Sequence, residues 1–164
     1  MNIIVTVDEN WAIGKKDKTF VQIPGNQRYL QQMTAGKTVV MGRKTMQALS
    51  QGIPMYGCEN IVLSQNPDFK GKGAKVVRSK EELLTALNGA PSGNVFVTGG
   101  ESVYKMLFDM CDTVYVTMVE KAYDADRYFE NLDKSPDWIM TEESDEQTYF
   151  DITYYFRKYE RHNS

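Results

Sequence analysis

The chain has 164 residues, of which 41% are hydrophobic and 25% charged, and its formal net charge is −3. This composition is typical of a soluble globular protein, so we expect residues 1–164 to form a single domain. The mild negative charge argues against nucleic acid or an anionic membrane surface as the main partner. No apolar run approaches the roughly 20 residues of a membrane span, and no signal peptide is visible. We therefore expect a cytoplasmic protein.

Cysteine and histidine content narrows the chemistry further. The chain has two cysteines, Cys58 and Cys111, and one histidine, His162. Two thiols in a chain of this size do not make a disulfide framework. A single histidine near the end of the chain leaves no basis for a Ser-His-Asp triad and removes most histidine-ligated metal sites. We therefore expect no metal centre.

Apolar runs and helix signals alternate along the chain. Pro24 is suited to the first turn of a helix, and Ser79 with Glu82 fits a capping box before an apolar stripe. In chain order, we expect a strand over Asn2–Val7, a helix from Pro24 to Gly36, a strand over Thr38–Met41, a short helix over 44–50, a strand over Asn60–Leu63, a helix between Ser79 and Gly89, a strand over Asn94–Thr98, a helix over Ser102–Met110, and strands over Thr113–Val119, Trp138–Glu142 and Tyr149–Tyr159.

This alternation predicts an α/β fold. Strands that alternate with helices favour a mostly parallel central sheet with helices on both faces. The last two expected strands, Trp138–Glu142 and Tyr149–Tyr159, are separated by a polar stretch near Asp145. We expect these two strands to form an antiparallel C-terminal hairpin at the edge of the sheet.

Two of the expected strand ends carry residues suited to binding phosphate. Gly99 and Gly100 stand between a buried strand and a helix, and the segment Gly42–Thr45 follows another buried strand with two cations and a hydroxyl. Ligands of open parallel sheets bind at the carboxyl ends of strands, where side-chain-free backbone and helix N-terminal amides accept phosphate. Each of these two features alone has an ordinary explanation. Gly99-Gly100 can be a tight turn, and Arg43 and Lys44 can belong to a solvated surface.

Five segments, in their order and spacing, resemble the dihydrofolate reductase family. They are Asn10–Gly14, similar to the loop over the active site; Val39–Thr45 and Val95–Tyr104, similar to two cofactor signatures; Asn60–Ser64, similar to a third cofactor strand; and Asp112–Thr117, similar to the strand with a buried threonine. The resemblance implies a dihydrofolate reductase-like fold, NADPH as the cofactor, and a monomer that reduces dihydrofolate to tetrahydrofolate in one-carbon metabolism.

The resemblance also implies where the cofactor would lie. Arg43 would pair with the 2′-phosphate, because a guanidinium matches a phosphate in geometry and charge. The other implied cofactor residues are Thr6, Ile13, Gly14 and Lys18 at the nicotinamide end; Gly42, Lys44 and Thr45 at the phosphates; Ser64, Gln65 and Arg78 around the adenosine 2′-phosphate; Gly99, Gly100, Glu101, Ser102, Val103 and Tyr104 around the pyrophosphate and nicotinamide; and Leu63 and Thr98.

The substrate positions depart from the family. Asn26 stands where the family has an acid that pairs with the pterin, and Cys58 stands where it has an arginine that grips the glutamate tail. Thr117 is retained, although its family partner is the missing acid. The resemblance assigns catalysis to Asn26 and Thr117, and substrate contacts to Ile4, Asn26, Leu30 and Cys58.

The loss of both charges predicts a slow enzyme that is insensitive to antifolates. General acid–base assistance is worth about 10²–10⁴-fold, and Asn26 carries no charge to provide it. Each replacement also has an ordinary structural explanation. Asn26 can be a residue that starts a helix, and Cys58 can be a small buried apolar residue. Relaxed selection, a changed substrate and antifolate resistance all stay open as reasons for the two replacements.

Three functions are compatible with the sequence. The first is NADPH-dependent reduction of dihydrofolate. The second is reduction of another pterin, without a tail, or of another imine, which the neutral tail groove motivates. The third is a non-catalytic NADP-binding protein. Turnover of dihydrofolate and of tail-less pterins, measured beside NADPH affinity, separates the three.

Overall fold

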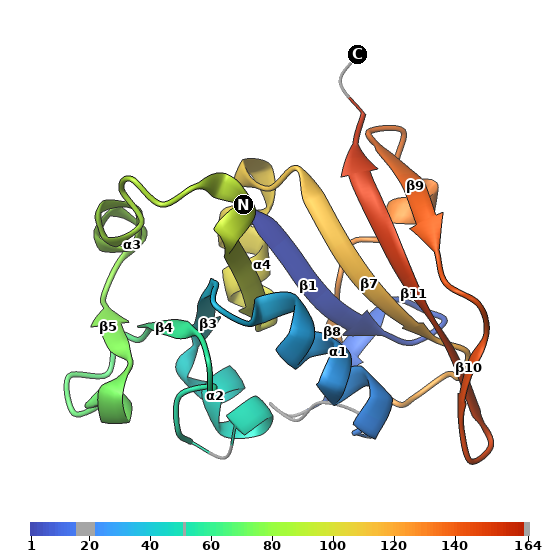
Figure 1. Cartoon of the computed structure of the whole chain (residues 1–164), viewed down its shortest axis with the longest axis horizontal. Helices are drawn as coiled ribbons and strands as arrows, with labels where there is room; N and C mark the ends of the chain where they lie inside the picture. Colours follow the sequence, from blue (N-terminus) through green and yellow to red (C-terminus); the bar gives the residue numbers. More distant parts are fainter. Residues whose placement is uncertain (16–21, 51, 163–164) are drawn as a thin grey trace.

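The computed structural model describes residues 1–15, 22–50 and 52–162. A nine-stranded sheet runs through its centre in the order β10-β11-β7-β1-β6-β3-β4-β5, with β9 paired to β11 (Figure 1). Its strands are β1 (Asn2–Val7), β3 (Thr38–Gly42), β4 (Glu59–Leu63), β5 (Lys75–Val77), β6 (Val95–Gly99), β7 (Thr113–Val119), β9 (Trp138–Glu143), β10 (Gln147–Tyr149) and β11 (Ile152–Arg161). A separate two-stranded sheet joins β2 (Ala12–Gly14) to β8 (Arg127–Tyr128).

Four α-helices and four short 3-10 turns connect the strands in the described part of the chain. The helices are α1 (Pro24–Thr34), α2 (Arg43–Ser50), α3 (Lys80–Ala86) and α4 (Glu101–Leu107), and the 3-10 turns are Gly71–Gly73, Ser92–Asn94, Phe108–Met110 and Leu132–Lys134. The helix expected over Ser102–Met110 therefore ends early, at Leu107, and its last turn tightens into a 3-10 turn.

The strand directions confirm the predicted fold class. Adjacent strands are parallel from β7 through β1, β6, β3 and β4 to β5, whereas β11 runs antiparallel to β7, β9 and β10. The parallel part has helices on both faces, because each βαβ crossover carries its helix over the sheet. The antiparallel strands form the C-terminal edge, as predicted.

One expected strand, Tyr149–Tyr159, is wrong as a continuous element. Phe150 has a φ of +54°, a left-handed conformation that extended strands do not contain. The chain therefore turns at Phe150 and Asp151, and β10 pairs back on β11 with Tyr149 opposite Ile152. The hairpin expected with Trp138–Glu142 is present as the pairing of β9 with β11.

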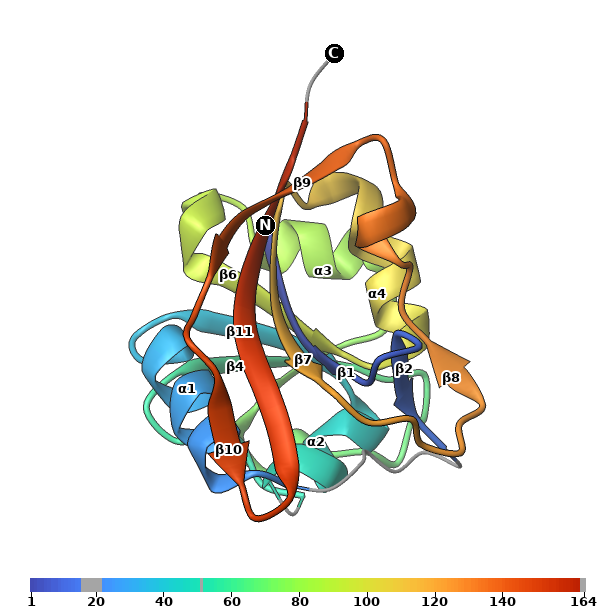
Figure 2. The ribbon, with the colours of Figure 1, turned by 90° about the vertical axis from the view of Figure 1, so that its right-hand side faces the viewer.

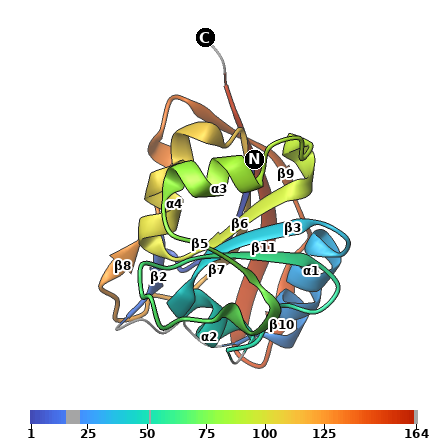
Figure 3. The ribbon, with the colours of Figure 1, turned by 90° about the vertical axis from the view of Figure 1, so that its left-hand side faces the viewer.

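Alternation along the strands divides the apolar residues into two cores. In β1, Ile3, Val5 and Val7 belong to the core that includes Leu83 of α3 and residues of α4. Ile4, between them, belongs to the opposite core, where side chains of α1 pack. Figures 2 and 3 show α1 on one side of the sheet and α3 with α4 on the other. Side chains of even-numbered β1 residues therefore point toward α1.

The carboxylate of Asp8 joins two segments of the chain at the end of β1. Its side chain is 1% exposed. One oxygen accepts hydrogen bonds from the backbone N–H groups of Asn10 and Ala12, both at 2.9 Å, and the other accepts from the N–H of Tyr123 at 2.8 Å. This carboxylate holds the chain that leads into β2 and the chain that follows β7.

We predict that Asp8→Asn destabilises the fold by about 1–3 kcal/mol, because the new NH2 group faces a buried backbone N–H instead of accepting from it. The midpoint and slope of urea unfolding measure the change. Asp68→Asn, at an exposed position, removes the same charge and should stay within about 0.5 kcal/mol of the parent. Equal midpoints for the two variants would show that Asp8 does not organise these segments.

Candidate functional site

Two glycine-bearing strand ends lie side by side at the carboxyl edge of the parallel sheet. Met41 of β3 is in register with Gly99 of β6. A Cβ atom placed on Gly42 would lie 3.9 Å from the Gly99 carbonyl oxygen and 4.0 Å from the Gly100 nitrogen. The Gly99-Gly100 peptide bond is cis, and Gly99 has a φ of +115°. The absence of side chains at these positions leaves bare backbone that a phosphate group can approach.

Helix α2 begins directly at the first of these strand ends. Arg43, Lys44 and Thr45 form its first turn, so their backbone amides belong to the helix N-terminus. A Cβ on Gly100 would lie 3.4 Å from the Thr45 hydroxyl, so the second strand end packs against this turn. Two cationic residues, one hydroxyl and a helix N-terminus thus follow directly on Gly42, which is a chemistry suited to phosphate.

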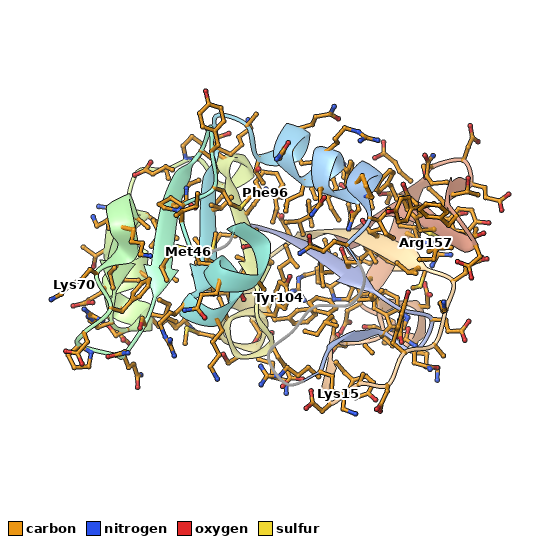
Figure 4. The ribbon with its side chains drawn as sticks, turned by 90° about the horizontal axis from the view of Figure 1, so that it is seen from below. Lys15, Met46, Lys70, Phe96, Tyr104 and Arg157 are labelled. Carbon is orange, nitrogen blue, oxygen red and sulfur yellow. The ribbon has the colours of Figure 1, made fainter. Side chains whose placement is uncertain are left out.

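Residues of α4 that were assigned to the cofactor have partners inside the protein. The Glu101 carboxylate accepts a hydrogen bond from the backbone N–H of Tyr128 at 2.9 Å, which joins α4 to β8. The buried Tyr104 hydroxyl donates to the Ile4 carbonyl oxygen at 2.8 Å, and burial raises the pKa of this phenol far above its ordinary value. Tyr104 is thus a neutral link between α4 and β1. Figure 4 labels it on the α4 side of the sheet and Phe96 on the α1 side.

A third strand end carries the residues assigned to the adenosine. Leu63 ends β4, and the Ser64 hydroxyl accepts from the N–H of Asn66 at 3.2 Å. The Arg78 guanidinium donates to the carbonyl oxygens of Ser64 at 2.9 Å, Asn66 at 2.6 Å and Phe69 at 3.5 Å. Arg78 therefore shapes the loop after β4, a role that the sequence did not indicate, while Gln65 is exposed on that loop.

The remaining residues assigned to the cofactor are spread over three elements of the described chain. Ile13 packs against the core on the α4 side, Gly14 is paired with Arg127 of β8, and the Thr98 hydroxyl donates to the Val40 carbonyl at 3.4 Å. Lys18 lies outside the described residues. The Thr6 side chain is on the face of β1 that points toward α1, and it bonds to Asn26.

Asn26 bridges two neighbouring strands. It is the third residue of α1, whose N-cap is Ile23, so it does not cap the helix. Its amide nitrogen donates to the Thr6 hydroxyl at 2.8 Å, and its amide oxygen accepts from the Thr117 hydroxyl at 2.7 Å. The structure thus brings together the two residues that were assigned to catalysis, Asn26 and Thr117, and adds Thr6 to them.

The residues assigned to substrate contact share one apolar cluster. Ile4 is buried in the core on the α1 side, and both Leu30 and Cys58 pack against it. The Cys58 thiol donates to the Met55 carbonyl at 3.5 Å. Burial raises the pKa of this thiol, against smaller opposite effects of hydrogen bonds from Asn60 and Thr34. Cys58 is therefore uncharged at neutral pH.

Gly25 shows why the start of α1 lacks a side chain before Asn26. A Cβ at this position would lie 2.4 Å from the Tyr154 hydroxyl of β11, closer than any real contact. The sequence did not indicate this constraint, because residues 25 and 154 meet only through the fold. The close approach fixes the first turn of α1 against β11, and with it the position of Asn26.

The fold and these strand ends define an open α/β protein with a phosphate-binding edge, and comparison with known proteins specifies the family. The family model described as dihydrofolate reductase matches residues 1–161. The chain is 32% identical to the dihydrofolate reductase of Bacillus subtilis (strain 168), over 100% of this chain and 96% of that protein. It is 28% identical to that of Staphylococcus aureus (strain N315), over 79% and 77% of the two chains. The chain therefore belongs to the dihydrofolate reductase family.

A solved structure agrees with this assignment. Dihydrofolate reductase from Enterococcus faecalis, complexed with NADP(H) and RAB-propyl, superposes with a TM-score of 0.84 at 27% sequence identity. The match covers 99% of this chain and 96% of that one. The members of this family are NADPH-dependent oxidoreductases.

Two observations bear on other classes of ligand. Across residues 1–15, 22–50 and 52–162, no helix is both long and apolar enough to cross a membrane. Within the same ranges, no three His, Cys, Asp or Glu side chains gather closely enough to hold a metal ion.

We predict that Arg43→Gln weakens NADPH binding about 10- to 100-fold, because a charge-assisted hydrogen bond contributes roughly 1.5–3 kcal/mol. NADH lacks the 2′-phosphate, so its affinity should change little. Fluorescence titration of both nucleotides measures the difference. Lys134→Gln, at an exposed position of the 3-10 turn Leu132–Lys134, is the matched charge control. An equal loss for NADH would place Arg43 elsewhere than at the 2′-phosphate.

Proposed function

We propose that the chain is an NADPH-dependent reductase that converts 7,8-dihydrofolate to tetrahydrofolate, and that it acts as a cytoplasmic monomer. The observation that carries the proposal is the pairing of the Gly42 and Gly99-Gly100 strand ends beside the Asn26 site, within a chain that matches the family along its length. Bound NADPH would supply a hydride to the imine carbon of the pterin ring. The monomeric state and the location stay predictions.

Asn26 orients the pterin ring in this proposal, and Ile4 and Leu30 pack against it. The two side chains bonded to Asn26 are the hydroxyls of Thr6 and Thr117, and neither titrates near neutral pH. Asn26, Thr6 and Thr117 thus include no carboxylate to favour protonation of the imine nitrogen, and in this proposal solvent supplies that proton. Turnover is accordingly slow and varies little with pH.

The groove for the glutamate tail is neutral in this proposal. Cys58 keeps its proton because burial raises its pKa, and the neighbouring Glu59 is exposed and negatively charged. Tyr29 stacks on Phe156 with ring centroids 4.1 Å apart, and burial raises its pKa to about 12. Lys37, whose carbonyl oxygen accepts from the backbone N–H of Glu59, donates through its side chain to Asn94 at 3.2 Å. A tail carboxylate thus gains no charged partner from Cys58 or Tyr29.

A second candidate function follows from that groove. A pterin without a glutamate tail loses nothing when the arginine is absent, so the enzyme would treat tailed and tail-less dihydropterins alike. Following NADPH absorbance with both substrates separates the two candidates. A clear preference for dihydrofolate removes the second one.

We predict that Asn26→Asp raises kcat/KM for dihydrofolate by about 10²–10⁴-fold, the usual contribution of acid–base assistance. The new carboxylate should also introduce a pH dependence between pH 5 and 8 that the parent lacks. Binding of 2,4-diaminopyrimidine antifolates should tighten in the same variant, since a protonated ring gains an ion pair. Steady-state kinetics and inhibitor titration measure these changes.

The matched control is Asn88→Asp, which adds the same charge at an exposed position and should leave turnover unchanged. If Asn26→Asp changes neither turnover nor inhibitor affinity, Asn26 is not at the substrate ring.

We predict that Cys58→Arg lowers KM for dihydrofolate about 10- to 100-fold, because a guanidinium forms a charge-assisted pair with the tail carboxylate worth roughly 1.5–3 kcal/mol. KM for a tail-less dihydropterin should stay the same. Cys58→Ser tests whether loss of the thiol alone has an effect. A parallel drop in KM for both substrates would mean that position 58 does not face the tail.

A further inference from the structure

The Thr6 side chain lies on the substrate side of the sheet. Along β1, the odd-numbered residues pack beneath α3 and α4, and Ile4 packs on the α1 side. Side chains two apart on a strand share a face, so Thr6 points the same way as Ile4. Its hydroxyl meets the Asn26 amide nitrogen at 2.8 Å.

The sheet places a second hydroxyl beside the first. β1 and β7 are parallel neighbours, and their register puts Thr6 opposite Thr117. Thr117 is 2% exposed and donates to the Asn26 amide oxygen at 2.7 Å. Two threonines on adjacent strands therefore hold one amide between them, and the close contact of Gly25 with Tyr154 holds the helix that carries it.

Hydrogen-bond arithmetic shows what this arrangement leaves for a ligand. A side-chain amide has two N–H donors and two acceptor positions on its oxygen. Thr6 and Thr117 together occupy one N–H donor and one acceptor position of the Asn26 amide. This holds for either orientation of the amide, because each threonine hydroxyl can donate or accept. One N–H and one acceptor position remain on Asn26, which is only half-buried. A carboxylate held in the same way would offer acceptors alone.

We infer that Thr6 is a positioning residue that fixes the Asn26 amide, so that the site recognises an uncharged heterocycle through an edge carrying a donor beside an acceptor. The lactam edge of an oxopterin has this pattern, as does a ring nitrogen beside an exocyclic amino group. A protonated ring presents two adjacent N–H donors. One of them faces the N–H of Asn26, where no hydrogen bond can form. This inference rests on the proposed function and deepens it by naming the chemistry of the recognised ring.

The test compares Thr6→Val, which removes the hydroxyl with little change of shape, with Thr6→Ser, which keeps it. Folic acid is the probe, titrated by calorimetry into the enzyme saturated with NADP⁺, and NADPH affinity is measured separately. We expect Thr6→Val to weaken folic acid binding by roughly tenfold, because it leaves one half-buried amide N–H of Asn26 without its hydroxyl partner. Thr6→Ser should stay within about twofold to threefold of the parent.

NADPH affinity should remain unchanged in both variants, which separates a role toward Asn26 from a role at the nicotinamide. A double-mutant cycle adds the decisive comparison: in an Asn26→Leu background, Thr6→Val should have no further effect. Three results would each overturn the inference. They are an equal loss of NADPH affinity, a Thr6→Ser variant as weak as Thr6→Val, and an undiminished effect in the Asn26→Leu background.

The binding readout does not depend on turnover, so it stays separate from the proposed function. If folic acid binds as described but no variant reduces dihydrofolate, the proposed reaction fails and the role of Thr6 stands. If Asn26→Asp restores turnover while Thr6→Val binds folic acid like the parent, the reaction stands and the role of Thr6 is lost.

Discussion

The parallel register of β1 and β7 is the constraint on which the rest of the site depends. It places the hydroxyls of Thr6 and Thr117 next to each other on the face that α1 covers. The first turn of α1 meets these two hydroxyls with the amide of Asn26. Because each hydroxyl adapts as donor or acceptor, this pair satisfies an amide as completely as it would a carboxylate. The fold therefore accommodates Asn26 without leaving a buried polar atom unpaired.

The cofactor edge and the α1 side of the site can therefore be considered separately. At the cofactor edge, Gly42 and Gly99-Gly100 leave backbone exposed beside Arg43 and the first turn of α2, and nothing in this arrangement depends on Asn26. On the α1 side, Asn26 and Cys58 are both neutral. In the proposed function, the cost of losing the acid falls on catalysis rather than on folding, since acid–base assistance acts in the transition state. A family member can thus keep its fold and cofactor site while its chemistry toward the ring changes.

Much of the fold follows from local sequence patterns. Apolar runs bounded by glycines and prolines identified the parallel strands, because strands buried on both faces need continuous apolar residues. The start of α3 was also predicted from local sequence: the Ser79 hydroxyl accepts from the N–H of Glu82, as expected of a capping box. The short strands β2, β5 and β8 were not predicted, because two or three residues carry too little periodicity. The turn at Phe150 was missed because a bulky residue with positive φ breaks the usual rules.

The sequence predicts those parts of the site that are contiguous segments, and not those formed by contacts between residues far apart in the chain. The segment Gly42–Thr45 is contiguous, so its chemistry can be read directly. The contacts of Thr6 with Asn26 and of Gly25 with Tyr154 join residues far apart in the chain, and only the register of the sheet brings them together. The resemblance puts Arg78 near the 2′-phosphate, and the structure adds that it donates to three carbonyl oxygens of its own loop. A guanidinium has five donors, and sequence alone does not say which of them the protein uses.

The central claim is that the ring of the ligand meets an uncharged amide. The protonation state of a bound 2,4-diaminopyrimidine, labelled with ¹⁵N at its ring nitrogens, tests this most directly. The account predicts that the NMR spectrum of the complex at neutral pH shows an unprotonated ring, because Asn26 provides no counter-charge and directs an N–H toward it. A protonated ring nitrogen in the parent protein, with the same shift as in the Asn26→Asp variant, would contradict it.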